Sequence, residues 1–196
     1  MKINKFIFIF FIYFLSISNS YSIEPSVFVQ STVNRASNIL SKNISNNDKI
    51  IQLKKIAKET VDINGIGFYT LGPIRKSLDN EQRQKFSELF EQYFLKSFSS
   101  RLVEYTNPKI DVYGKETLNE NYTIVNSLLE GTKDRPEVKI DWRIYTKNPE
   151  SPLIRDLIIE GLSLVRTQKE EFSSILNSNN GDINFLFSTL EEFSKN

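Results

Sequence analysis

The spacing of apolar residues changes at Pro108, and this change is the strongest constraint that the sequence places on the fold. Before Pro108, apolar residues recur every three or four positions, the period of a helix that buries one face. After it, Val138, Ile140 and Trp142 alternate with charged residues, the period of a half-buried strand. A chain that separates helices from strands in this way is predicted to be an α+β protein.

The clearest element is a long helix from Asp79 to about Val103. Asp79 and Gln82 have the spacing of a capping box, in which each side chain bonds the backbone amide of the other residue. The apolar residues of this helix are mostly aromatic: Phe86, Leu89, Phe90, Tyr93, Phe94 and Phe98. We expect the helix to cover one face of the sheet.

The other elements follow from the same two patterns. Helices are expected over residues 25–40 and 48–60, in a short segment ending at Gly72-Pro73, and over residues 165–177 and 182–193. Strands are expected over residues 110–113, 122–130, 138–145 and 153–161. Short polar turns join these strands, which favours an antiparallel meander. The predicted fold is a four-stranded antiparallel sheet wrapped by N- and C-terminal helices, with room for an apolar cavity between the layers.

The first 22 residues have the order of a secretory signal peptide. Lys2 and Lys5 precede an apolar run from Phe6 to Leu15, and small polar residues follow. The run is shorter than the roughly 20 residues that a membrane-spanning helix needs. We expect residues 1–22 to be removed on export to the periplasm, leaving residues 23–196 as one domain. An uncleaved N-terminal anchor is the alternative.

Two residue types that carry much enzyme chemistry are absent, since the sequence contains no histidine and no cysteine. A Ser-His-Asp or Cys-His nucleophile system and the usual zinc ligands are therefore excluded. The formal net charge is +1, and this near-neutral balance argues against nucleic acid as a partner. We expect no cofactor and no metal ion. Only carboxylate, lysine, tyrosine or serine chemistry remains.

Asp141 and Asp156 are the candidates for carboxylate chemistry, because their strands should be neighbours. Two carboxylates in a half-closed cavity can act as acid and base if their pKa values differ. The simpler interpretation is that each points outward and pairs with Arg143, Arg155 or a lysine. Glu170-Glu171 are adjacent on a helix and face different directions, so they do not indicate a metal site.

The run RDLIIEGLSLVRTQKEEF, residues 155–172, joins a strand to a helix. Alternation gives the strand two faces, one with Leu157 and Ile159 and the other with Asp156, Ile158 and Glu160. Gly161 is expected to permit the bend from strand to helix, and Ser163 to cap that helix. We interpret the aliphatic residues as pocket wall and the charged ones as ties to neighbouring elements.

Several short runs between Val61 and Leu190 keep the order and rough spacing of one family: Leu71-Gly72, Glu81-Gln82-Arg83, Phe86, Phe90, Asp156, Glu160-Gly161, Ser163-Leu164-Val165 and Phe172. With these residues the chain resembles the MlaC-like periplasmic phospholipid-binding proteins, auxiliary components of an ABC lipid transport system. The chain departs from the family pattern at Pro152, Gln168-Lys169 and Phe98, where the family has Trp, a Tyr-Arg pair and Tyr.

The resemblance implies a cystatin- or NTF2-like sheet wrapped by helices, with lipid tails inside. It also implies a non-enzymatic carrier of phospholipid. Such a carrier shuttles lipid between an outer-membrane lipoprotein–porin complex and an inner-membrane MCE-domain ABC transporter, and so maintains the lipid asymmetry of the outer membrane.

The tails are expected among apolar residues of the long helix, the strands and the helix that follows them: Phe86, Phe90, Tyr93, Phe94, Val125, Ile140, Trp142, Leu157 and Leu164. Two alternatives remain open. One is an NTF2-like cavity enzyme that uses Asp141 or Asp156 as its base. The other is a periplasmic adaptor that binds only proteins and has a filled core.

Overall fold

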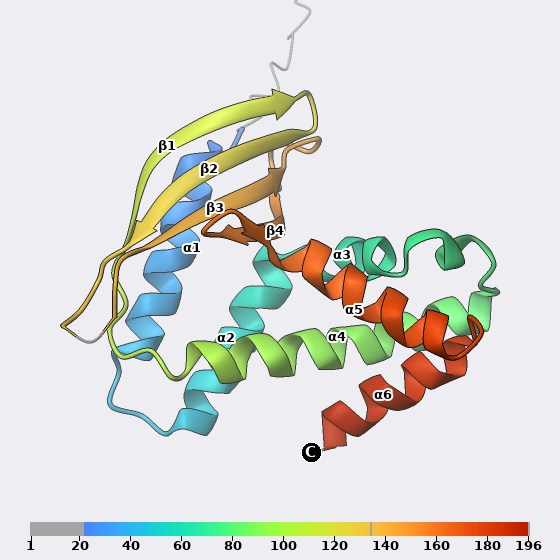
Figure 1. Cartoon of the computed structure of the whole chain (residues 1–196). Helices are drawn as coiled ribbons and strands as arrows, with labels where there is room; N and C mark the ends of the chain where they lie inside the picture. Colours follow the sequence, from blue (N-terminus) through green and yellow to red (C-terminus); the bar gives the residue numbers. More distant parts are fainter. Residues whose placement is uncertain (1–21, 134, 196) are drawn as a thin grey trace, which may run out of the picture.

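The computed structural model describes residues 22–133 and 135–195 of the chain (Figure 1). The predicted signal peptide, residues 1–22, lies outside the described residues except for Ser22. Within the described part, no helix combines the length and the apolar composition needed to cross a membrane.

Most of the helices that precede the sheet begin after a polar capping residue. They are α1 (Pro25–Leu40), α2 (Asn46–Thr60), α3 (Ile63–Thr70), the 3-10 helix η1 (Gly72–Lys76) and α4 (Asn80–Leu102). Ser45 and Asp62 each accept a hydrogen bond from a backbone amide in the first turn of their helix. Both bonds of the capping box between Asp79 and Gln82 are present at the start of α4, so that prediction is confirmed.

The sheet is antiparallel and its strands follow the chain order, five of them among the described residues. The strands are β1 (Ile110–Asn119), β2 (Tyr122–Leu129), β3 (Val138–Tyr145), β4 (Leu153–Ile159) and β5 (Leu162–Ser163). Two helices follow them, α5 (Leu164–Ser178) and α6 (Ile183–Lys195). The α+β prediction is confirmed. The predicted number of four strands is wrong, because the two-residue β5 pairs with β4.

The connection between β4 and β5 is a tight hairpin turn at Glu160 and Gly161. Their φ angles are 49° and 83°, and positive values at both central residues characterise a type I′ turn. The Lys139 amide donates to Glu160 Oε1 at 2.6 Å and ties the turn to β3. Gly161 therefore reverses the chain into β5. The expectation that it bends a strand directly into a helix is wrong. Ser163 caps α5 as predicted, accepting from the Arg166 amide at 3.0 Å.

Replacing Gly161 with alanine should lower the free energy of unfolding by about 1 kcal/mol. Apart from Gly161 and its two chain neighbours, no residue has an atom within 4 Å of the place that a Cβ would take, so the cost comes from the positive φ alone. Urea denaturation followed by circular dichroism measures it. Leu162→Ala is the control, because Leu162 is exposed and its change should stay within about 0.5 kcal/mol. An unchanged stability of Gly161→Ala would contradict this turn.

One face of the sheet packs against α1. Val29 of α1 forms a cluster with Val125, Trp142 and Ile144 of the strands, which we call the sheet core. The buried Trp142 indole donates to Ser127 Oγ at 2.8 Å, so its polar atom is satisfied inside this cluster. Helix α1, and not the phenylalanine-rich helix, therefore covers the sheet.

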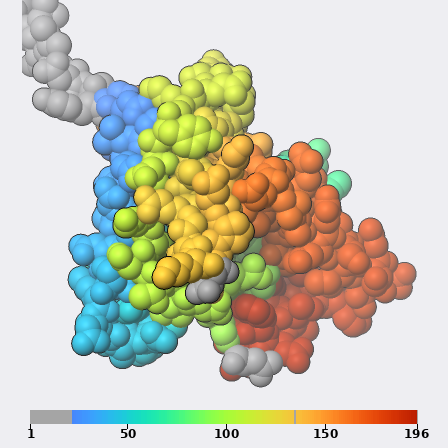
Figure 2. Space-filling model, turned by 60° about the vertical axis from the view of Figure 1, so that its left-hand side comes forward, coloured from blue at the N-terminus to red at the C-terminus, as the bar shows by residue number. Residues whose placement is uncertain are grey.

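The long helix α4 belongs to a second cluster, the helical core, with α3, α5 and α6. The centre of the Phe90 ring lies 5.6 Å from the centre of the Phe86 ring and 6.1 Å from that of Phe172 on α5. The expectation that α4 covers the sheet is wrong, because its aromatic side chains pack against the other helices. Figure 2 shows the sheet, in yellow, between the N-terminal helices, in blue, and α5 and α6, in orange and red.

The two cores meet where α2 joins α3. Val61 packs against both cores and forms an isolated bridge with Ile154 of β4. The Asp62 amide donates to the Ile154 carbonyl at 3.0 Å. The Asp62 carboxylate accepts from Arg155 Nε at 2.6 Å and lies 2.5 Å from Arg155 Nη2. These contacts join the helices to β4. We call the four residues the α2–α3 junction: Val61, Asp62, Ile154 and Arg155.

A side chain from α1 occupies part of the outer edge of β1. Gln30 Nε2 donates to the Ile110 carbonyl at 3.1 Å, and the Val112 amide donates to Gln30 Oε1 at 3.0 Å. Glu24, just before α1, forms an ion pair with Lys115 of the same strand. The Gln30 amide thus bonds two outward-facing backbone groups of this edge strand.

Candidate functional site

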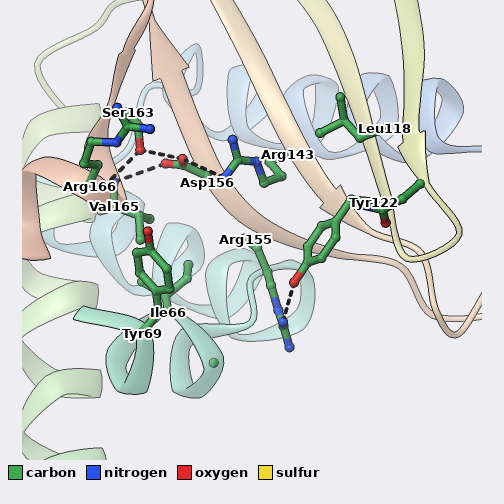
Figure 3. A pocket seen from close by; sticks show the side chains of 12 residues that line it. Ile66, Tyr69, Leu118, Tyr122, Arg143, Arg155, Asp156, Ser163, Val165 and Arg166 are labelled. Atoms are coloured by element: carbon green, nitrogen blue, oxygen red, sulfur yellow. Dashed lines mark hydrogen bonds and ion pairs between the residues drawn. The ribbon is translucent and has the colours of Figure 1, made fainter. Parts of the chain in front are cut away.

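A pocket of about 310 Å³ opens beside the α2–α3 junction (Figure 3). Helix α3, the β1–β2 turn, β3, β4, β5 and the start of α5 all contribute to its wall. The apolar part of the lining includes Ile66, Leu118 and Val165. Ile66 and Val165 also pack in the helical core. The apolar side of the pocket wall is therefore part of the surface of that core.

Asp156 is the buried acid of this pocket, with only 3% of its surface exposed. Its carboxylate accepts from Ser163 Oγ at 2.6 Å and from the Val165 amide at 3.1 Å. Arg143 Nη1 lies 3.9 Å from the same carboxylate. Asp156 thereby ties β4 to the first turn of α5, which explains why an aspartate precedes the EGLSLV run. The interpretation of the charged residues as structural ties is confirmed for Asp156.

Arg155 lines the same pocket and is held by the fold on several sides. It is paired with Asp62, donates to the Tyr122 hydroxyl at 2.7 Å, and lies 3.9 Å from the centre of the Tyr145 ring. Burial would lower the pKa of Arg155, but the hydrogen bonds to Asp62 and Tyr122 outweigh this effect and raise the pKa. Arg155 therefore keeps its charge, which Asp62 balances.

The carboxylates do not form an acid–base pair. Asp141 accepts from Asn126 Nδ2 at 2.8 Å, whereas Asp156 binds Ser163 and Val165. Because each carboxylate has its own partners, the geometry does not support a proton shared between them. Among the residues that the structure describes, no cluster of three or more acidic side chains could hold a metal ion.

The nine residues predicted to contact lipid tails do not line this pocket. Phe86, Phe90, Tyr93 and Phe94 lie in or against the helical core. Val125, Ile140, Trp142 and Leu157 lie in or against the sheet core, on the side of the sheet that α1 covers. Leu164 is exposed at the start of α5. The nine predicted residues therefore do not form one site. Four belong to the helical core, four to the sheet core, and one lies at the surface.

Tyr93 is the polar member of the helical-core group. Its hydroxyl donates to Gln168 Oε1 at 2.7 Å and so connects α4 to α5. Burial raises the pKa of the Tyr93 hydroxyl, and the nearby charge of Glu171 adds to this effect. The hydroxyl is therefore a neutral hydrogen-bond donor at physiological pH.

Sequence reasoning misses the polar wall of the pocket. Alternation alone suggests that Arg143 and Arg155 are ordinary surface residues, and it gives no role to Arg166. A bulge in the pairing of β3 with β4 places Arg155 against Tyr122 and Tyr145, and a bulge is not visible in the sequence. One usable signal is present for two of the arginines, since Arg155 and Arg166 lie within the run of residues 155–172, whereas Arg143 lies on the preceding strand.

Comparison with known proteins agrees with this architecture. The model of the MlaC protein family matches residues 30–192. A solved structure with a similar fold is that of a phospholipid-binding protein from Ralstonia solanacearum in complex with a phospholipid. The TM-score is 0.74 and the sequence identity 17%, and the match covers 88% of this chain and 98% of that one. At this identity the likeness shows a common fold, whereas the family match spans most of the sequence. The chain belongs to the MlaC family.

Proposed function

We propose that this protein is a carrier that binds phospholipid and moves it through the periplasm. The match to the MlaC family over residues 30–192 carries the proposal. The common fold with a protein solved in complex with a phospholipid supports it. So does a pocket whose wall is apolar on the side of the helical core and cationic on the side of the strands.

The energetics of lipid transfer set what such a carrier must provide. Each CH₂ removed from water contributes about 0.8 kcal/mol, so two long acyl chains together contribute on the order of 20 kcal/mol. The carrier must replace most of this burial, which requires an enclosed apolar volume. The pocket of about 310 Å³ is at the lower end of the usual range for small-ligand pockets, about 300–1,000 Å³. The tails therefore need more space than the pocket alone provides.

We place the tails between the pocket and the helical core. Ile66 and Val165 belong to both, so a tail that passes them reaches the aromatic residues of α4. Separation of the helices from the sheet would supply the missing volume. The predicted contacts of the helical core, Phe90 and Phe94 among them, suit this route, while Trp142 and its neighbours lie on the α1 side of the sheet.

The wider role follows from the family. Residues 1–22 would direct export to the periplasm and be removed, and residues 23–196 would act as one lipid-binding domain. The partners would be an inner-membrane MCE-domain transporter and an outer-membrane lipoprotein–porin complex. Transfer between them would maintain the lipid asymmetry of the outer membrane. This role needs no catalytic residue and no cofactor.

Protein made from the full chain and purified without detergent should carry one two-chain phospholipid per molecule. Native mass spectrometry gives the bound mass, and organic extraction identifies the lipid. A clean apo mass, together with no uptake from liposomes, would contradict the carrier and favour an adaptor that binds only proteins.

A matched pair of variants on β1 tests whether the pocket is the entrance. Leu118 lines the pocket, and Tyr113, on the same strand, does not. Both residues are exposed, so a charged replacement should leave folding intact. Leu118→Asp should lower bound lipid roughly 5-fold or more, because a carboxylate replaces apolar surface at the mouth. Tyr113→Asp should leave it unchanged. Equal losses in both variants would place the entrance elsewhere.

A further inference from the structure

The pocket contains an arginine that the fold holds only loosely. Arg143 Nη1 is 3.9 Å from Asp156, whereas Arg155 in the same pocket lies 2.5 Å from its partner Asp62. In addition, Arg143 Nε is buried and has no hydrogen-bond partner. A buried donor that lost its water without gaining a partner is costly. The guanidinium of Arg143 is therefore positioned without being satisfied by the protein.

The acid beside Arg143 is already bound elsewhere. One oxygen of Asp156 accepts from Ser163 and the other from the Val165 amide. In the first turn of α5, the Val165 amide is therefore bound to Asp156, and the next amide, that of Arg166, donates to Ser163 Oγ. These two amides are thus engaged, whereas the Arg143 guanidinium keeps a donor that the protein leaves unpaired.

Arg166 supplies a second such donor. It lies in the first turn of α5 and lines the pocket. Its side chain is exposed, and no ion pair or hydrogen bond holds it among residues 22–133 and 135–195. Figure 3 draws Arg143 and Arg166 on either side of the Asp156 carboxylate. Asp62 balances the charge of Arg155. The positive charges of Arg143 and Arg166 then exceed the negative charge of Asp156 by one.

We propose that Arg143 and Arg166 bind the phosphate group of the lipid in this pocket. The inference rests on the proposed function and specifies which part of the lipid the pocket recognises. Planar guanidinium groups donate paired hydrogen bonds that match phosphate oxygens. Leu118 and Ile66 flank the same space with apolar surface, which suits the glycerol carbons and the first methylenes of the tails.

This assignment makes a specific statement about selectivity. The arginines contact the phosphate, which all phospholipids share, and not the group beyond it. The protein should therefore discriminate between lipids with and without a phosphate, and discriminate little between phospholipid headgroups.

The test is competition between two lipids with identical acyl chains. Full-chain protein is incubated with phosphatidylglycerol vesicles that contain a minor fraction of diacylglycerol, and the bound lipids are extracted and quantified by mass spectrometry. Wild type should enrich the phospholipid over diacylglycerol roughly 10-fold relative to the vesicles, the effect of charge-assisted hydrogen bonds to one anion. The double variant Arg143→Gln/Arg166→Gln should lower this enrichment to near one while still binding diacylglycerol.

Three controls keep the outcomes distinct. Arg101→Gln/Lys147→Gln removes the same charge from exposed positions outside the pocket and should keep the enrichment. Arg166→Gln alone changes an exposed side chain and should lose part of the enrichment even if the double variant folds poorly. Isothermal titration with inorganic phosphate tests for a site that binds the free anion.

Each result decides the matter. Equal uptake of both lipids by wild type would overturn the phosphate site and leave the carrier intact. No uptake of either lipid would overturn the carrier, and the phosphate site with it. Binding of inorganic phosphate without lipid enrichment would assign the arginines to a free anion instead of a lipid.

Discussion

Replacing Phe90 with alanine should lower the free energy of unfolding by about 4 kcal/mol, as for other large core aromatics. Only 2% of Phe90 is exposed, and its ring packs near those of Phe86 and Phe172. The backbone of α3 approaches closely as well, since a Cβ on Gly67 would lie 2.7 Å from Phe90 Cδ1. Because this packing is tight, neighbouring side chains have little freedom to move into the cavity that truncation leaves. Urea denaturation followed by circular dichroism measures the loss.

Phe185→Ala is the matched control for this change. Phe185 lies on α6, and 52% of it is exposed, so its truncation should cost less than about 1 kcal/mol. A similar loss in the two variants would show that the helical core is not organised around α4. A loss below about 1 kcal/mol for Phe90→Ala would contradict the packing described here.

The second large effect is expected for Asp156→Ala, at about 3 kcal/mol of unfolding free energy. The change leaves the Ser163 hydroxyl and the Val165 amide without their acceptor and Arg143 without its nearest counter-charge. Because Asp156 joins β4 to α5, we also expect faster amide hydrogen exchange in the first turn of α5. Denaturation and hydrogen exchange together measure both effects.

Asp141→Ala separates this connecting role from the general effect of removing a carboxylate. Asp141 is on the neighbouring strand and binds only the Asn126 side chain among the described residues. Its replacement should cost less than about 1 kcal/mol. If Asp156→Ala were as mild as Asp141→Ala, the link between β4 and α5 would have another origin.

Local sequence patterns predict most of the elements of this fold. The capping box of α4, the helical period of its aromatic residues and the alternation in β3 all depend on neighbours in the chain. The strand β5 is missed because two residues are too few to show a period. The sequence pattern therefore predicts a bend at Glu160 and Gly161, whereas two positive φ angles make this turn a hairpin.

The pairing of layers is much less visible in the sequence. The aromatic face of α4 could be buried equally well against the sheet or against other helices. What decides between them is that α1 already covers the sheet, through Val29 and its neighbours. The predicted tail contacts fall into two cores for this reason. The pocket itself depends on Arg143, Arg155 and Arg166, which come together only through strand register and the start of α5.

The contact between Gln30 and β1 has a consequence for self-association. The exposed edge of a sheet is a template on which a strand from another molecule can add, and this is a common origin of aggregation. At Ile110 and Val112 the outward backbone groups already have a partner within the same molecule. An incoming strand must displace Gln30 before it can form its first bonds there. The helix that covers the sheet therefore also protects this part of its edge against edge-to-edge polymerisation.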